Sequence, residues 1–204
     1  MGIYIKDTEV TALNVLSKLN VLEKSIIERT IDVGYSDSLL TSLRNYAFIR
    51  CKSLPSADLP NCTTIRGHAF YYCQKLSHVN IPACTIIGTD AFGYCAKLSS
   101  INPLACTELG IDAFENCTSL STISLPACTL INNHAFSNCR SLMNVYLMGN
   151  SVCTLSGSMV FTNTPMVNST YTGAFGSIFV PASLLTQYQS ATNWATLSSR
   201  FVGI

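Results

Sequence analysis

Cysteine and histidine are the residue types through which this chain could do chemistry, as nucleophiles, general bases or metal ligands. The chain has 204 residues, of which 10 are cysteines and 3 are histidines. A zinc site requires close pairs of cysteines such as C-x-x-C, and the sequence contains none. The cysteines follow one another instead at a constant interval of 11 residues from Cys51 to Cys139, and only Cys153 departs from it. Disulfide frameworks have irregular spacings, so the constant interval indicates an internal repeat.

The repeat has a period of 22 residues and contains two cysteines in each unit. Residues 91–101 show its pattern, AFGYCAKLSSI, in which apolar residues stand at fixed positions. A unit of this size is too small to bury its own apolar side, so neighbouring units must stack and share one core. Equivalent residues of successive coils would then lie about 4.8 Å apart, as in paired parallel strands. The segment Leu-x-x-Val-x-Ile predicts a short strand, and Ala-Phe-x-x-Cys-x-x-Leu predicts a short helical side of each coil.

The repeats resemble those of the BspA-like leucine-rich repeat family. The family pattern is an aliphatic residue followed by Ala-Phe-x-x-Cys-x-x-Leu-x-x-Ile-x-Ile-Pro, and it is matched by IRGHAFYYCQKLSHVNIPACT at residues 65–85 and INNHAFSNCRSLMNVYL at 131–147. The resemblance implies an α/β fold, a right-handed leucine-rich-repeat solenoid with a parallel strand ladder. One unit has Pro103-Leu104 in place of Ile-Pro. Proline cannot donate to a strand ladder, so we expect this strand to be bent or shortened.

Three segments follow from the repeat: an N-terminal segment at 1–42, five repeats at 43–148, and an irregular last repeat with a C-terminal cap at 149–204. Residues 8–29 predict a helix that either caps the first coil or forms an oligomer. The last segment has an imperfect coil around Val160-Phe161, then a closing helix and Trp194. Its only charged side chain is Arg200, so it either caps the solenoid or packs against another chain. The tail IFVPASLLTQYQSATNW resembles the end of prophage-type members of the family.

The register of the cysteines predicts small buried residues rather than reactive thiols. Identical side chains in a ladder point in parallel, which is poor geometry for a disulfide. We therefore expect at least eight of the nine registered thiols to be buried, reduced and unbridged. The environment of Cys153 does not follow from the pattern.

Two of the histidines share one column of the repeat. His68 and His134 stand directly before Ala-Phe, and Tyr46, Asp90 and Asp112 stand at the same position in other units. Each side chain would point outward from its own coil, so we do not expect convergence on one metal ion. Known phosphate, dinucleotide and nucleophile motifs are also missing from the sequence. The sequence therefore predicts a non-catalytic protein with no cofactor and no metal site.

Two outward-facing surfaces are candidates for binding. The first is the exposed face of the strand ladder, where hydrogen-bonding side chains alternate with buried residues: Asp58, His78, Asn80, Ser100, Asn102, Thr122, Ser124, Asn144 and Tyr146. The second is a short aromatic stack of Tyr72 and Tyr94 on another side of the coil, and stacked tyrosines suit contacts with a sugar or a protein.

The net charge and the hydropathy of the chain argue against two classes of partner, nucleic acids and membranes. A net charge of +1 argues against nucleic acid, and no apolar run is long enough for membrane insertion. The first residues lack the pattern of a secretory signal, so we expect a phage virion released by lysis, or the bacterial cytoplasm. The family resemblance implies adhesion to a protein or glycan of a cell surface, and the prophage-like tail suggests host recognition by a phage tail. The alternative is a structural, self-assembling subunit that forms a homo-oligomer or fibre through the N-terminal helix and the charge-poor C-terminal region.

Overall fold

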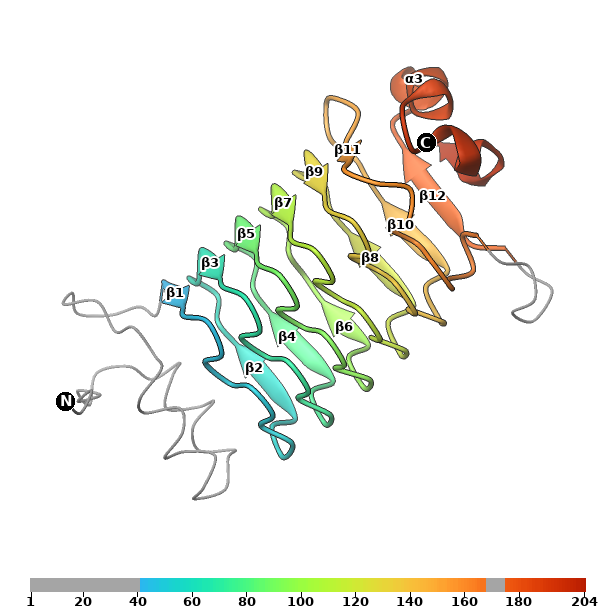
Figure 1. Ribbon diagram of the computed structural model, residues 1–204. Helices are drawn as coiled ribbons and strands as arrows, with labels where there is room; N and C mark the ends of the chain where they lie inside the picture. The colour runs from blue at the N-terminus through green and yellow to red at the C-terminus, as the bar shows by residue number, and fades with distance from the viewer. Residues whose placement is uncertain (1–40, 168–174) are drawn as a thin grey trace.

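Each 22-residue unit contributes two short strands to a parallel β-solenoid of about seven turns (Figure 1). The computed structural model describes residues 41–167 and 175–204. The N-terminal helix predicted at 8–29 lies outside the described residues. The elements are β1 (Ser42–Leu43), β2 (Ser56–Asp58), β3 (Thr64–Ile65), β4 (His78–Asn80), β5 (Ile86–Ile87), β6 (Ser100–Ile101), β7 (Glu108–Leu109), β8 (Thr122–Ser124), β9 (Leu130–Ile131), β10 (Asn144–Tyr146), β11 (Thr154–Leu155), β12 (Ser177–Val180), η1 (Ala182–Leu184), α3 (Leu185–Ser190), η2 (Ala195–Arg200) and β13 (Phe201–Gly203).

The strands form two separate sides of the solenoid because the chain visits each side once per coil. One side is a six-stranded sheet in the order β1-β3-β5-β7-β9-β11. The other side holds a three-stranded sheet, β2-β4-β6, and a four-stranded sheet, β8-β10-β12-β13. Within the repeats, partners in neighbouring strands are 22 residues apart, as in the pairing of Val79 with Ala57. This register confirms the predicted period and the parallel strand ladder.

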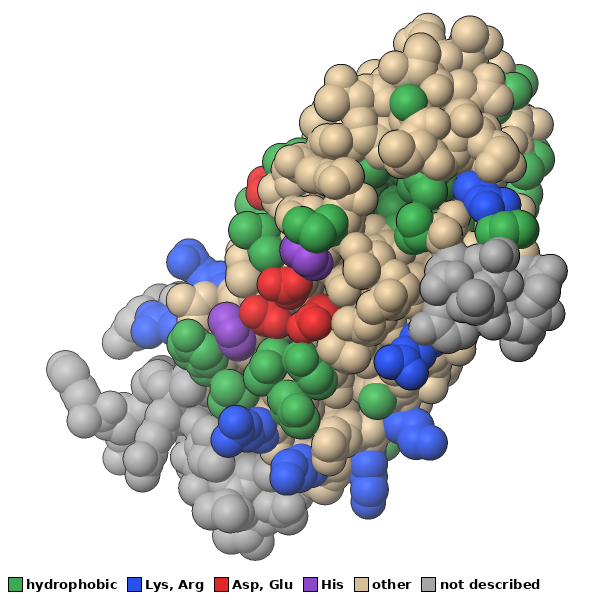
Figure 2. Space-filling view, turned by 45° about the vertical axis from the view of Figure 1, so that its right-hand side comes forward, with side chains coloured by type: hydrophobic (Ala, Val, Ile, Leu, Met, Phe, Trp, Pro, Cys, Tyr) green, Lys and Arg blue, Asp and Glu red, His purple; other side chains and the backbone are tan. Residues whose placement is uncertain are grey.

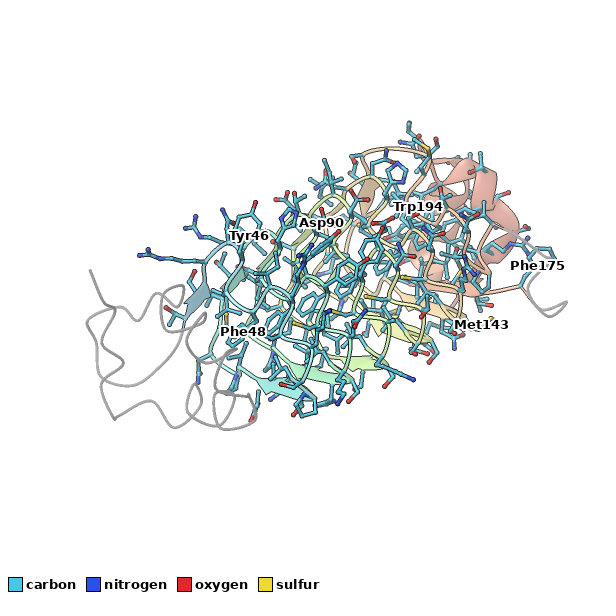
Figure 3. All side chains as sticks on the ribbon, turned by 60° about the horizontal axis from the view of Figure 1, so that its bottom comes forward. Tyr46, Phe48, Asp90, Met143, Phe175 and Trp194 are labelled. Atoms are coloured by element: carbon cyan, nitrogen blue, oxygen red, sulfur yellow. The ribbon has the colours of Figure 1, made fainter. Side chains whose placement is uncertain are left out.

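The core is a continuous ladder of identical side chains. Six phenylalanines, one in each of six coils, are buried and stack with ring centroids 5.0 to 5.5 Å apart and planes within 9° of parallel, from Phe48 to Phe161. Figure 3 shows Phe48 inside the coil. Because each ring contacts only the rings above and below it, the core is extended along the solenoid axis rather than gathered at one centre.

All ten cysteines are buried and have free thiols, so the predicted burial of the registered thiols is confirmed. The two columns use different hydrogen-bond acceptors. In the column after Ala-Phe, the thiols from Cys73 to Cys139 donate to the phenylalanine carbonyl of the preceding coil, as Cys95 does to Phe70 (3.1 Å). In the other column, each thiol donates to a carbonyl two residues ahead, as Cys84 does to Ile86 (3.2 Å).

The Ala-Phe-x-x-Cys side of each coil consists of turns, and the short helix predicted there is wrong. Two residues of the second coil, His68 and Tyr72, have positive φ angles of 57° and 62°. The N–H of Cys73 donates to the carbonyl of Phe70 three residues earlier (3.1 Å), whereas the N–H of Phe70 donates to Ala91 in the next coil (2.7 Å). Left-handed residues cannot continue a right-handed helix. The alternation of turn bonds and inter-coil bonds ties this side of the solenoid together without a helix.

The coil with Pro103 interrupts the strand ladder, as predicted. Strand β6 has two residues where β4 and β8 have three, and the sheet divides between β6 and β8. Elsewhere the residue at this position donates its N–H to the next coil, as Leu125 does to the Tyr146 carbonyl (2.8 Å). Proline has no N–H to donate. The N–H of Ile81 in the preceding coil donates to the side chain of Asn102 instead (2.8 Å).

The C-terminal segment closes the core, as the cap interpretation predicted. After β12, the segments η1, α3 and η2 fold over the last coil and β13 pairs with β12 (Figure 1). Trp194 and Tyr188 are buried there, and the Trp194 ring lies 5.9 Å from Phe161. The Trp194 indole donates to the Cys153 carbonyl (2.6 Å), and the Cys153 N–H donates to the Tyr188 hydroxyl (2.9 Å). The tenth cysteine is therefore an anchor for the cap.

The boundaries predicted at 42/43 and 148/149 stay predictions. None of the helices within 41–167 and 175–204 is long and apolar enough to span a bilayer.

Candidate functional sites

The strands β2, β4, β6, β8 and β10 place two rows of side chains on one outward surface, which we call the strand face. Neighbouring coils are in register, since His78 pairs with Ser56 and Ser100, and Asn144 pairs with Thr122. All nine predicted residues lie on this surface. Four are exposed, namely Asp58, His78, Ser100 and Thr122, and five are half-buried, namely Asn80, Asn102, Ser124, Asn144 and Tyr146.

The N-terminal half of the strand face is organised by a ladder of amide hydrogen bonds. The Asn80 amide donates to the Asp58 carboxylate (2.7 Å), and the Asn102 amide donates to the Asn80 side-chain oxygen (2.7 Å). Bonds between side chains of successive coils fix the orientation of these groups. The row of His78, Ser100 and Thr122 beside the ladder is more exposed and is the part of the face open to a partner.

The C-terminal half of the strand face is aromatic. The rings of Tyr146 and Phe179 stack with centroids 4.5 Å apart and planes 10° from parallel. Phe179 stands on β12 and pairs directly with Tyr146 of β10. The 22-residue period does not predict Phe179, because Phe179 follows its strand partner Tyr146 by 33 residues. The alternation in SIFV at residues 177–180 is the signal that could have revealed it.

The histidine column lies on the turn side of the solenoid, where Tyr46, His68, Asp90, Asp112 and His134 all have positive φ. Figure 3 shows Tyr46 and Asp90 on the outside of this side. Neighbouring members do meet: His68 Nε2 lies 3.4 Å from Asp90 Oδ2, and the Tyr46 ring lies 5.0 Å from the His68 ring. The side chains of His68 and Asp90 therefore meet across two neighbouring coils. Among the described residues, no three His, Cys, Asp or Glu side chains are grouped to hold a metal ion.

The tyrosine stack is confirmed, with the Tyr72 and Tyr94 rings 4.7 Å apart and 9° from parallel. A third tyrosine that the sequence analysis missed, Tyr71, contacts both rings edge-on at 5.1 and 5.5 Å. Gly93 makes room for it, because a Cβ at that position would lie 2.9 Å from Tyr71 Cδ2 and 2.8 Å from Asp90 Oδ1. The sequence signal for this contact was Gly93 itself, a glycine at a position where the other units have larger residues.

Three carboxylates lie beside the tyrosines and influence one another. Burial raises the pKa of Asp90 above its ordinary value, His68 opposes that shift, and Asp112 adds to it. Burial also raises the pKa of Glu115, and the charges of Asp112 and Asp90 raise it further. The charge of Glu115 is the main cause of a raised pKa at the neighbouring Tyr94. These shifts mean that negative charge is concentrated on this part of the turn side.

Comparison with known proteins supports the architecture. The pattern described as the BspA type leucine rich repeat region matches residues 63–179 in 6 copies, which is more than half of the chain. No curated protein matches the chain.

Two solved structures have the same architecture. The leucine-rich repeat protein of T. pallidum (TpLRR) aligns at 28% identity and a TM-score of 0.53, over 63% of this chain and 60% of that one. A leucine-rich cell surface protein of Faecalibacterium prausnitzii A2-165 aligns at 22% identity and a TM-score of 0.54, over 74% of this chain and 45% of that one. At this level of identity, the similarity to the F. prausnitzii protein concerns the fold alone. The chain spans less than two thirds of the length of either protein.

Proposed function

Because the chain belongs to the BspA-type leucine-rich repeat family, we propose that it is a non-catalytic binding protein that recognises a protein or glycan of a cell surface. The observation that carries this proposal is the strand face. Its rows are held in register by paired strands, so one exposed group per coil recurs along a rigid surface. Such a surface suits an extended partner with repeated contacts.

The state of the potential nucleophiles supports a binding role. Every cysteine is buried, and burial raises the pKa of Cys95 and Cys106 to about 12, so their thiols keep their protons at neutral pH. The known F. prausnitzii protein with this fold is described as a cell surface protein.

The test is binding of the purified chain to glycan arrays and to protein and glycan fractions of cell envelopes. Ser100→Arg with Thr122→Arg places two large charged side chains on the strand face, and both wild-type residues are exposed, so folding should be unaffected. We expect this variant to lose binding. Ser156→Arg, exposed near the six-stranded sheet, is the matched control and should bind like the wild type. Absence of binding to any fraction, or equal binding by the strand-face variant, would overturn the proposal.

A self-assembling subunit is the second candidate, and one observation favours it. Of nine exposed large apolar side chains among the described residues, five belong to the C-terminal region, namely Met159, Val167, Phe175, Val202 and Ile204. The single charged residue of that region, Arg200, has its guanidinium carbon 3.3 Å from the centre of the Phe175 ring and donates to the Met166 carbonyl. Light scattering at high protein concentration tests this candidate. A strict monomer contradicts it.

We also propose, from the resemblance of the C-terminal segment alone, that the chain is a component of a phage particle. Mass spectrometry of purified particles and of bacterial cell fractions tests this location. Recovery in the cytoplasmic fraction alone contradicts it.

A further inference from the structure

A second surface lies on the turn side of the solenoid, away from the strand face. It consists of Tyr71, Tyr72, Asp90, Tyr94, Asp112 and Glu115, which we call the tyrosine–carboxylate patch. Figure 2 shows acidic side chains gathered in one cluster between two histidines, with hydrophobic side chains beside them and lysine and arginine around the periphery. Three of the five carboxylates in the described residues, counting Asp58 and Glu108 elsewhere, belong to this patch.

The tyrosines occupy backbone positions that do not favour them. Tyr72 and Tyr94 have φ angles of 62° and 61°, in the left-handed region. The following coils have Asn116, Asn138 and Asn163 at the same position of the repeat, with φ between 56° and 60°. Asparagine tolerates this conformation far better than tyrosine does. The backbone conformation therefore favours asparagine at this position, and the presence of two tyrosines there requires another reason.

Packing does not supply that reason, because the rings remain half-buried on the surface. Tyr72 and Tyr94 stack in parallel, and Tyr71 meets both of them edge-on. The result is an aromatic platform that spans two coils. Gly93 maintains it, since any larger residue at that position would displace Tyr71 and Asp90.

Charge indicates what the platform binds. Asp112 raises the pKa of Asp90, both of these carboxylates raise the pKa of Glu115, and Glu115 raises the pKa of the nearby Tyr94. Bringing a cation to this cluster relieves repulsion among the carboxylates. A guanidinium can stack on a tyrosine ring while it donates to a carboxylate, and its positive charge favours it here over a neutral sugar.

We propose that the tyrosine–carboxylate patch binds an arginine-containing, cationic segment of a protein partner. The guanidinium lies against the tyrosine platform and donates to the carboxylates of Asp90 and Glu115. This surface is separate from the strand face, and its assignment requires only that the solenoid be a binding protein.

The test uses fluorescein-labelled hexa-arginine as the probe, with hexa-glutamate and the neutral sugar chitohexaose for comparison. We expect the chain to bind hexa-arginine, with affinity that falls as salt concentration rises, and to bind the other two weakly. Tyr72→Asn with Tyr94→Asn should lower the affinity about tenfold while the melting temperature stays equal or rises, since asparagine suits the backbone there. Asp112→Asn with Glu115→Gln should lower the affinity and remove most of its salt dependence.

One control variant separates the patch from general electrostatics, and a further variant tests the tyrosine platform. Glu108→Gln neutralises a carboxylate outside both surfaces and should leave hexa-arginine binding unchanged. Gly93→Ala should weaken binding by displacing Tyr71, with only side chains in its way.

Several results would overturn the assignment: equal binding of hexa-arginine and hexa-glutamate, preference for chitohexaose, or undiminished binding by the Tyr72→Asn, Tyr94→Asn variant. Because the probe is a synthetic peptide, these results do not depend on whether a cell-surface ligand is found for the strand face. Conversely, loss of cell-surface binding in the Ser100→Arg, Thr122→Arg variant with intact hexa-arginine binding would show that the two surfaces act independently.

Discussion

The buried thiols form a row of proton-bearing groups along the core, and eight of the nine registered thiols donate a hydrogen bond to a backbone carbonyl. Cys117 donates to the Phe92 carbonyl (3.1 Å), and Cys139 donates to the Phe114 carbonyl (3.0 Å). A small side chain is required at this position because the phenylalanine ladder runs beside it, and serine would be more costly to bury. The thiol must also stay protonated to donate. Solvent pH is therefore linked to the stability of the fold through the cysteines.

Stability should fall at alkaline pH. Burial raises the pKa of Cys62 to about 11 and those of Cys84, Cys95 and Cys106 to about 12, from an ordinary value of 9.0. The folded chain therefore keeps protons that the unfolded chain releases above pH 9. The stabilising contribution is complete below pH 9 and is lost as pH rises towards 12, with a slope of about 1.4 kcal/mol per pH unit for each thiol.

Denaturant unfolding followed by circular dichroism over this pH range measures that slope. Cys95→Ala removes one of the thiols and should reduce the slope by about 1.4 kcal/mol per pH unit. An identical slope in the variant and the wild type would show that other groups cause the alkaline loss of stability.

Gly110 permits a close approach between two coils of the solenoid. An alanine Cβ at this position would lie 2.5 Å from both the Gly88 carbonyl carbon and the Thr89 nitrogen, which are backbone atoms. We expect Gly110→Ala to lower the free energy of unfolding by about 1–3 kcal/mol, because the coils must separate. Gly67→Ala, whose Cβ would lie 3.2 Å from the nearest atom, should have a smaller effect in the same denaturation experiment. Equal losses would contradict the backbone clash.

At the scale of elements, the turns show where prediction from apolar spacing fails. Ala-Phe-x-x-Cys-x-x-Leu has intervals of three residues, which suit one face of a helix equally well. The structure uses the same spacing for successive turns, because two residues per coil are left-handed. The columns that contain Asp90 and Asp112, or Asn116 and Asn138, carried the missing signal, since aspartate and asparagine favour left-handed positions.

The candidate sites were predictable in part for a related reason. The strand-face residues that belong to the repeats could be placed from the period alone, because in-register strands repeat their outward positions, whereas Phe179 falls outside the period. The tyrosine stack followed from the period in the same way. The roles of Tyr71 and Glu115 did not, since they depend on side chains leaning from one coil across Gly93 to the next.

The gap in the strand ladder at Pro103 should be repairable. Pro103→Ile restores an N–H at a position where Leu59 and Leu125 donate to the next coil. We expect an increase of about 1 kcal/mol in the free energy of unfolding, and slow exchange of the new amide with deuterium. Pro82→Ile adds an N–H outside the strand ladder and should give no gain. Stabilisation by both variants alike would indicate a general effect of removing proline.

At the scale of the whole molecule, stability is distributed along one axis. Each coil contacts only its neighbours, so the ends of the solenoid have apolar surfaces that must be covered. The C-terminal cap covers one of them, and it rests on two buried aromatic residues, Trp194 and Tyr188. Both of them hydrogen-bond to the backbone of Cys153, the cysteine outside the regular interval. We therefore expect a destabilising substitution at one end of the solenoid to affect mainly the coils near that end.

Trp194→Ala tests this expectation. Removing the indole uncovers Phe161 and leaves the Cys153 carbonyl without its donor, so we expect a loss of about 3–5 kcal/mol in the stability of the C-terminal coils. Hydrogen–deuterium exchange should accelerate strongly at β9 to β12 and little at β3 to β5, because the disturbance must pass from coil to coil. Thr196→Ala, at an exposed position of η2, should leave exchange unchanged. Uniform acceleration along the whole solenoid would mean instead that the coils unfold as one cooperative unit, in which the cap supports every repeat equally.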